Sequence, residues 1–205
     1  MKQEKKDIIA FLKENVAPLN DVTLGAGYRA SAYLLDGTYL PCVIFRNPRA
    51  IVNLAIKRFK EEMVGGSIFS RKPKSNYYNL VKGFVATGNC VNEYDIQRVE
   101  KSRHAFPIDF QMQIKGETTM GWTGFSAKMK DGKYLGFGTN FRWEFFQMPD
   151  EYSVDDITEI INHSYVLKSG ELVSHRETQM TRPENYAEAV VHREMPFFEC
   201  FIDDL

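Results

Sequence analysis

Three side chains able to bind a metal stand at helical spacing near the C-terminal end of the chain. Glu184, Glu188 and His192 follow one another at intervals of four residues. On an α-helix this spacing aligns side chains along one face, where two carboxylates and an imidazole would suit a divalent cation. A solvated polar face has the same spacing, and a metal site needs further ligands from elsewhere in the fold. The pattern therefore favours a solvated face, with the metal site as the lesser alternative.

A second pattern loosely resembles the acid and Gln-x-Lys strand of metal-dependent nucleases. Gln113 and Lys115 share a face with Asp109 on an alternating segment, 108–115. Metal-assisted phosphodiester cleavage needs clustered carboxylates, which this segment does not supply. The chain also lacks the Gly-x-x-x-x-Gly-Lys-Ser/Thr, Gly-x-Ser-x-Gly and His-Glu-x-x-His motifs. A metal-dependent hydrolase or nuclease is thus the third interpretation. No cofactor is predicted, and the absent motifs favour a protein that is not an enzyme.

A basic and aromatic segment, Lys57–Tyr78, offers the chemistry of nucleic-acid contact. Its candidate contact residues are Arg71, Lys72, Lys74, Tyr77 and Tyr78. Cations attract phosphates and tyrosine rings stack on bases, which makes association with nucleic acid the alternative function. The sequence pI of about 6.4 argues against it, because nucleic-acid-binding domains typically have a pI above ~9. A solvated loop leading into a strand, 77–86, accounts for the same residues.

The segment from Gly116 to Gly124 has three glycines, a tryptophan and several hydroxyls. Such a composition suits a loop that a ligand or another backbone approaches closely. A pocket there would be lined by Glu117, Trp122, Arg142 and Glu144. A bulged entry to a strand, with Trp122 in the core, is the competing interpretation.

Composition places the chain among ordinary intracellular globular proteins. It has 205 residues, of which 43% are hydrophobic and 26% charged. Its three cysteines show no Cys-x-x-Cys spacing, which indicates a reducing compartment without structural zinc or disulfides. The apolar run Ile8–Leu12 is too short for a signal peptide or a membrane span. We therefore expect a soluble, cytoplasmic protein of bacterial type with no membrane partner.

Charge is unevenly distributed along the sequence. Residues 41–115 carry 13 basic and 6 acidic groups, whereas residues 116–205 carry 8 and 16. Opposite charges of this size favour mutual neutralisation, either within the chain or between copies of it. A basic surface for a polyanion is the alternative. The polarity suits a protein partner or self-association.

A ten-residue phrase occurs twice and predicts two hairpins. Residues 31–40 and 126–135 agree at six of ten positions, and each copy contains Asp-Gly. Asp-Gly between strand-forming residues predicts a type I′ turn, which needs positive φ at both central positions. Each hairpin is followed by a capped apolar segment, 48–63 and 154–163, which predicts a helix in both places. The shared order of elements suggests an internal duplication, for which convergence is the alternative.

Further elements complete an α+β prediction. Helices are expected at 2–16, 92–103 and 183–194, a half-buried strand at 108–115 and an edge strand at 195–202. The expected fold has mainly antiparallel sheets, Asp-Gly hairpins and about four to five helices. It forms a single compact domain or two similar lobes, about 20–106 and 107–205. The leading functional interpretation is a non-catalytic binding or protein-interaction module.

Overall fold

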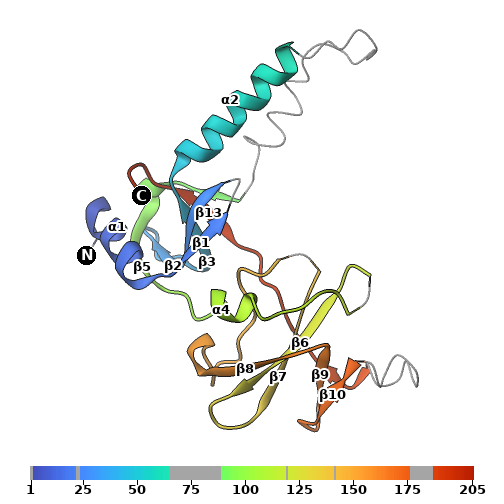
Figure 1. The fold of residues 1–205 in the computed structure, drawn as a ribbon. Helices are drawn as coiled ribbons and strands as arrows, with labels where there is room; N and C mark the ends of the chain where they lie inside the picture. Colours follow the sequence, from blue (N-terminus) through green and yellow to red (C-terminus); the bar gives the residue numbers. More distant parts are fainter. Residues whose placement is uncertain (1, 22–23, 65–88, 119, 141, 176–186) are drawn as a thin grey trace. The chain divides into compact units, whose positions relative to one another are not determined.

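The computed structural model describes residues 2–21, 24–64, 89–118, 120–140, 142–175 and 187–205 (Figure 1). The chain divides into two compact units. Unit 1 comprises Met1–Glu100 together with Phe198–Leu205, and unit 2 comprises Lys101–Phe197. Within the described residues, no helix is long and apolar enough to cross a membrane.

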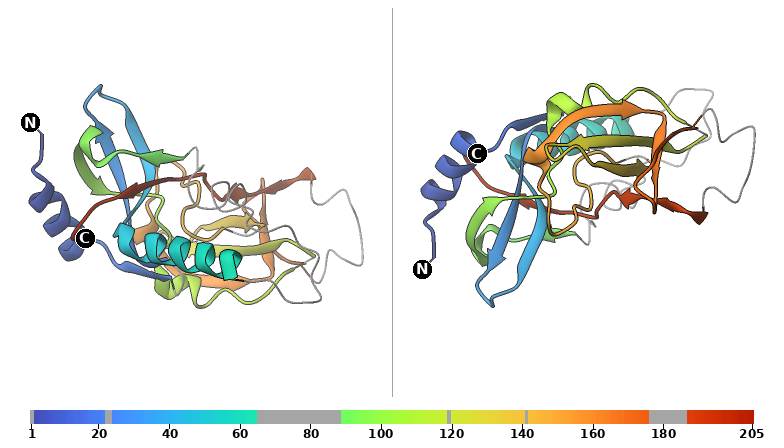
Figure 2. Two further views of the ribbon diagram at one scale, coloured as in Figure 1. Left: turned by 90° about the horizontal axis from the view of Figure 1, so that it is seen from above. Right: turned by 90° about the horizontal axis from the view of Figure 1, so that it is seen from below.

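Unit 1 contains a mixed sheet built around the first Asp-Gly hairpin. Its strands lie in the order β1 (Pro18–Asp21), β2 (Gly25–Leu34), β3 (Tyr39–Arg46), β13 (Phe198–Phe201) and β4 (Cys90–Val91), and β5 (Ile96–Lys101) also pairs with β2. In Figure 2 the green β5 lies beside the blue hairpin in both views. Two helices, α1 (Lys5–Asn15) and α2 (Pro48–Val64), complete the unit.

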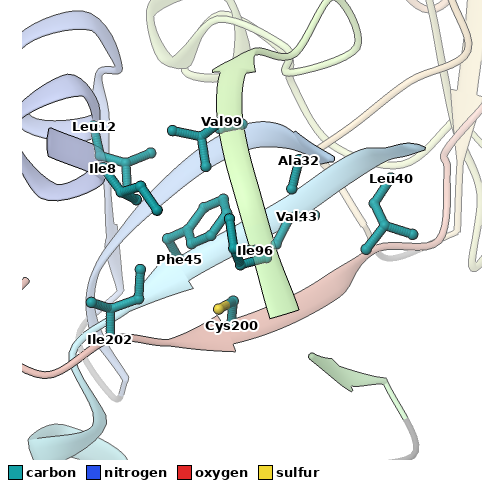
Figure 3. Packing of buried hydrophobic residues seen from close by; sticks show 11 residues of the cluster. Ile8, Leu12, Ala32, Leu40, Val43, Phe45, Ile96, Val99, Cys200 and Ile202 are labelled. Atoms are coloured by element: carbon teal, nitrogen blue, oxygen red, sulfur yellow. The ribbon is translucent and has the colours of Figure 1, made fainter. Parts of the chain in front are cut away.

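The core of unit 1 gathers residues that are far apart in the sequence. Ile8 and Leu12 of α1 are 4% and 0% exposed, as the four-residue apolar spacing of this helix predicts. They lie with Phe45 of β3, Ile96 of β5 and residues of the C-terminal segment in one buried cluster (Figure 3). Cys200 and Ile202, from the last eight residues of the chain, therefore belong to the core of unit 1.

Unit 2 is built on the second hairpin. Its larger sheet has the order β12 (His192–Arg193), β7 (Tyr134–Thr139), β6 (Thr123–Met129) and β8 (Ile157–Asn162). A smaller sheet has the order β10 (Leu172–Ser174), β9 (Ser164–Leu167) and β11 (Ala189–Val190), and a short helix, α4, spans Ile108–Gln111. The core is aromatic. Phe106, Phe125, Phe137 and Phe146 pack with ring centroids 5.1–5.6 Å apart, mostly edge to face.

Both predicted hairpins are present, but their turns are not type I′. Gly37 and Gly132 have φ of 89° and 86°, while the only described non-glycine residues with positive φ are His163 and Asp204. Leu34 O accepts from Gly37 N at 3.0 Å, and Leu34 N donates to Thr38 O at 2.8 Å. This is a three-residue loop in which a turn is followed by a left-handed glycine. Asp36 therefore needs no positive φ and serves instead as a side-chain acceptor.

The predicted mainly antiparallel fold with four to five helices is wrong. The described residues are mostly β, contain three α-helices and form mixed sheets with parallel pairings. The parallel pairs are β13 with β3 and β4, and β12 with β7. β13 is an interior strand, not the expected edge strand. Hairpin signals are local, whereas a parallel pair joins segments that only the folded chain brings together.

Two segments that the sequence predicted to be helices are strands in the structure, and one predicted strand begins as a helix. Segments 92–103 and 154–163 each begin with a single 3₁₀ turn, η1 (Glu93–Asp95) and η2 (Val154–Asp156), and continue as strands β5 and β8. Ser153 and Asp156 do form the predicted capping box. Pairing with the hairpin, together with β-branched residues such as Ile157 and Ile160, stabilises an extended strand after the turn.

Segment 108–115 shows the opposite exchange, since it begins as α4 and not as a strand. Phe110 and Ile114, four residues apart, pack together against the core of unit 2. The side-chain amide of Gln111 donates to Phe106 O at 3.0 Å and to Trp143 O at 2.7 Å. A period of two and a period near four both fit this short segment, and packing selected the helical one.

The two units share an arrangement that the sequence did not reveal. In unit 1 the order β5-β2-β3-β13 matches β8-β6-β7-β12 in unit 2, and the fourth strand is parallel to the third in both. Leu35 N donates to Asp95 O at 2.9 Å, and its counterpart Lys130 N donates to Asp156 O at the same distance. The elements that correspond in the two units are the hairpin, the 3₁₀ turn, and the two strands that pair with the hairpin on either side. The predicted helix at 154–163, on which the expected hairpin-strand-helix duplication rested, is absent.

Candidate functional site

The first turn of α2 is fixed to unit 1. Asn47 Oδ1 accepts from Arg49 N at 2.9 Å, which caps the helix, and Asn47 Nδ2 donates to Leu205 O at 3.2 Å. Pro48 at the first helical position needs no hydrogen-bond partner for its nitrogen. A Cβ built on Gly25 of β2 would lie 3.4 Å from the Cβ of Ala50. The sheet and the C-terminus thus hold the start of this helix in place.

Beyond its first turn, α2 presents apolar side chains to solvent. Val52 and Ile56 are 50% and 46% exposed, and no described α2 side chain belongs to the buried core. Ile51, Leu54 and Ala55, on the other side of the helix, are only half-buried. The sequence predicted this helix correctly but implied that its apolar face was buried. The side chains of Phe59 and Met63, two further apolar residues of α2, lie outside the described residues.

Cations stand at both ends of the exposed apolar pair. Arg49, Val52, Ile56 and Lys60 follow at spacings of three, four and four residues, so they form one stripe along the helix. We call these four residues the α2 stripe. The Arg49 side chain is 81% exposed, and its 3.9 Å ion pair with Asp204 is a surface contact of small energetic value. Lys57, also exposed, adds a third cation beside the stripe.

The predicted pocket residues of unit 2 have structural partners. Glu117 Oε2 accepts from Gly121 N at 3.1 Å within its own loop. Trp122 packs flat on the sheet, because a Cβ on Gly138 would lie only 2.0 Å from its ring. The guanidinium of Arg193 covers the ring at 4.6 Å from its centroid. Trp122 is therefore held between a glycine and an arginine, where it is half-buried and lies outside the buried core cluster of unit 2.

The other two pocket candidates are engaged elsewhere in unit 2. The guanidinium of Arg142 lies 4.9 Å from the ring centroid of Phe197, and Glu144 Oε2 accepts from Trp143 N at 2.9 Å. These contacts join Arg142 to Phe197 and Glu144 to its own neighbour, Trp143. Each of the four predicted pocket residues therefore has a contact within unit 2.

A polar group that the sequence did not single out surrounds Arg193. Its guanidinium donates to Glu194 at 3.1 and 3.2 Å and to Asn140 Oδ1 at 3.2 Å. Burial raises the pKa of the Glu194 carboxyl, but hydrogen bonds from Arg193 and Asn140 outweigh it and hold the pKa below its usual value. Trp122 and Arg193 are distant in sequence, and no local pattern links them. This group fixes the C-terminal strand of unit 2.

The predicted metal face does not form as one helical stripe. Glu184 lies outside the described residues, Glu188 forms a 3.4 Å ion pair with Lys168, and His192 lies in β12 beside the ring of Phe137. Burial lowers the pKa of His192. Among the described residues, no group of three or more His, Cys, Asp or Glu side chains is arranged to hold a metal. Strand pairing with β7 and β9 accounts for the described part of the segment.

The other residues that the sequence suggested as sites either lie outside the described residues or make local contacts. Arg71, Lys72, Lys74, Tyr77 and Tyr78 lie outside the described residues, as does the predicted strand 77–86. Asp109 and Gln113 share a local contact, in which Gln113 Nε2 donates to Asp109 O at 3.1 Å. That contact follows the four-residue spacing of a helical turn, so the nuclease-like strand is not present.

Comparison with known proteins adds no family assignment. No family model matches the chain, and neither a curated protein sequence nor a solved structure matches it. The function must therefore be argued from the residues of the chain itself.

Proposed function

We propose that this chain is a non-catalytic protein-interaction module and that the α2 stripe contacts the partner. The observation that carries the proposal is the exposure of Val52 and Ile56 on a helix whose described side chains join no core. Exposed apolar side chains that adjoin along one helix face are typical of helices that dock in an apolar groove.

The charges of the stripe indicate which surface of a partner protein would be complementary to it. Arg49 and Lys60 flank the apolar pair, so the complementary groove is apolar at its centre and acidic at its rim. The capped, anchored first turn supports the proposal as well. A helix that is already formed and fixed at one end loses less conformational entropy on binding than an unfolded segment.

Site-specific photocrosslinking in the natural host tests the proposal. We expect p-benzoylphenylalanine at position 56 to yield a discrete protein adduct. The same probe at Leu35, which is 51% exposed at the tip of the first hairpin, serves as the matched control and yields no such adduct. Adducts of equal yield from both positions, or none from position 56, would show that the stripe is not an interface.

Substitutions separate binding from folding. Val52→Ser with Ile56→Ser removes apolar area that is already half in water, so the free energy of unfolding changes by less than about 1 kcal/mol. Affinity for the crosslinked partner falls by about tenfold or more, because exposed apolar anchors contribute mainly on binding. Isothermal titration and urea unfolding measure the two quantities. A large loss of stability would instead place these side chains in the fold.

Charge reversal distinguishes a protein partner from nucleic acid. Arg49→Glu with Lys60→Glu should slow association with an acidic-rimmed partner and reduce its salt dependence. Oligonucleotide binding with a steep salt slope, lost in Arg71→Ala/Lys72→Ala/Lys74→Ala and retained in the Val52→Ser/Ile56→Ser variant, would favour the alternative function.

A further inference from the structure

Unit 1 contains a cavity of about 360 Å³ between the start of α1 and the segment formed by η1 and β5. Its floor is apolar. It is lined by Ile8 of α1, Ile96 of β5 and Ile202, the residue after β13 (Figure 3). These side chains are 4%, 0% and 1% exposed. The remaining lining residues are Lys2, Gln3, Glu4, Lys5, Glu93 and Tyr94.

Hydrogen bonds hold the N-terminal wall of the cavity. Gln3 N donates to Gln97 O at 2.8 Å, and Gln3 Oε1 accepts from Val99 N at 2.9 Å. Lys2 Nζ donates to Tyr94 O at 2.9 Å. The segment before α1 is thus attached to β5 and η1, so the cavity has walls fixed by contacts on both sides.

One polar atom in the lining accepts no hydrogen bond from the described residues. Glu93 Oε2 is buried, and its nearest cation, Lys5 Nζ, forms an ion pair at 3.4 Å without hydrogen-bond geometry. A buried acceptor without a hydrogen bond carries an energetic cost even beside a cation, and a ligand that donates a hydrogen bond would relieve it.

The charges of the lining cancel. Lys2 and Lys5 are balanced by Glu4 and Glu93, so the site has no net charge to attract an ion. The apolar floor and the buried Glu93 oxygen, which accepts no hydrogen bond from the described residues, then define the ligand. We propose that the cavity binds a small, uncharged, largely apolar molecule that donates one hydroxyl or N–H hydrogen to Glu93 Oε2.

The volume sets the size of that molecule. Small-molecule sites span roughly 300–1,000 Å³, and an apolar cavity of about 150 Å³ already holds benzene. A fused bicyclic ring therefore fits with room for a substituent. Tyr94, which is 75% exposed at the opening, can cover one face of such a ring.

Indole and 1-methylindole test the site as a matched pair of probes, because they differ in the N–H donor. We expect indole, added to the full-length protein, to shift the NMR signals of the isoleucine methyl groups at positions 8, 96 and 202. Ile157 and Ile160 of unit 2 serve as internal controls and should not shift. Shifts absent at the three positions, or of equal size throughout the chain, would overturn the site.

The donor assignment has its own test. 1-Methylindole should bind about tenfold more weakly than indole, because the hydrogen bond to Glu93 Oε2 is lost. Glu93→Met removes the acceptor while retaining the chain length, so the two probes should then bind equally. A preference that survives in Glu93→Met, or its absence from the unaltered protein, would contradict donation to Glu93. Ile8→Phe, which fills the cavity, should weaken both probes.

Discussion

The hairpin turns depend on two residues with different roles. In each loop a glycine takes the left-handed conformation, and the preceding side chain accepts a backbone hydrogen bond. Asp36 Oδ1 accepts from Thr38 N at 2.9 Å, and Asp131 Oδ1 accepts from Lys133 N at 3.0 Å. The first of these bonds lowers the pKa of Asp36. The turn between the antiparallel strands β9 and β10 uses Ser169 and Gly170 in the same way. The Asp-Gly pair therefore stabilises the turn and does not by itself indicate a function.

Gly37→Val and Gly132→Val test the backbone role. Each site has open space around the missing Cβ, so any penalty comes from the positive φ and not from a clash. We expect each variant to lose about 1–3 kcal/mol of unfolding free energy, measured by urea denaturation. Gly37→Asn is the matched control and should lose less, because asparagine tolerates a positive φ. Equal losses in the valine and asparagine variants would contradict this explanation.

Among the elements, β13 places a C-terminal segment in the sheet of unit 1. It lies between β3 and β4 in parallel with both, and Cys200 in it is 0% exposed. Burial raises the pKa of the Cys200 thiol to about 12, so this cysteine remains a protonated core residue. A strand added from the far end of the sequence completes the first unit.

Ile202→Ala measures the contribution of this C-terminal segment. Removing a fully buried isoleucine leaves a void, so we expect a loss of about 2–5 kcal/mol. Hydrogen exchange should accelerate first in β3 and β5, whose side chains share its core. Phe198→Leu in the same segment is the control, because Phe198 is 38% exposed, and it should cost less than about 1 kcal/mol. Similar losses in the two variants would mean that the segment does not complete this core.

At the scale of the whole molecule, the division into units changes the meaning of the charge pattern. The sequence halves differ strongly in charge, but the acidic residues near the C-terminus belong to unit 1. By sequence, unit 1 carries 15 basic and 13 acidic groups and unit 2 carries 11 and 14. Net charges of +2 and −3 leave little polarity between the units. The proposed interaction through the α2 stripe would therefore depend on local charges and not on a charge difference between the units.

The histidines, in contrast, are confined to one unit. All four lie in unit 2, and burial lowers the pKa of His104, His175 and His192 below the ordinary value of 6.5. In the unfolded chain these imidazoles take up protons near their ordinary pKa, whereas in the fold they stay neutral to lower pH. Stability from these groups is thus fully present above pH 6.5 and is lost as the pH falls below it.

Tryptophan fluorescence can follow this loss in unit 2, which contains both Trp122 and Trp143. We expect the urea midpoint of the fluorescence transition to fall between about pH 7.5 and about pH 5.5. His192→Leu should reduce that fall, since one titrating group is removed. Unit 1 contains no histidine, so protection of its β3 amides from hydrogen exchange is the control and should change less over this range. A midpoint independent of pH would contradict the burial of these imidazoles.

The sequence by itself determined the features that depend on neighbouring residues. It predicted α1 and its buried face, the start and length of α2, both Asp-Gly hairpins and the capping box at Ser153. Each of these follows from spacing, caps or turn residues within a few positions of one another.

Features that depend on pairing between segments far apart in the sequence could be seen only in the tertiary structure. Segments 92–103 and 154–163 became strands because hairpin strands pair with them, and β13 became an interior strand because β3 and β4 lie on both sides of it. Pairing energy exceeded the local helix signals there. The same reason hid the candidate sites: the sequence shows that α2 has apolar residues but not that its stripe is exposed, and the cavity at Glu93 joins residues from both ends of the chain.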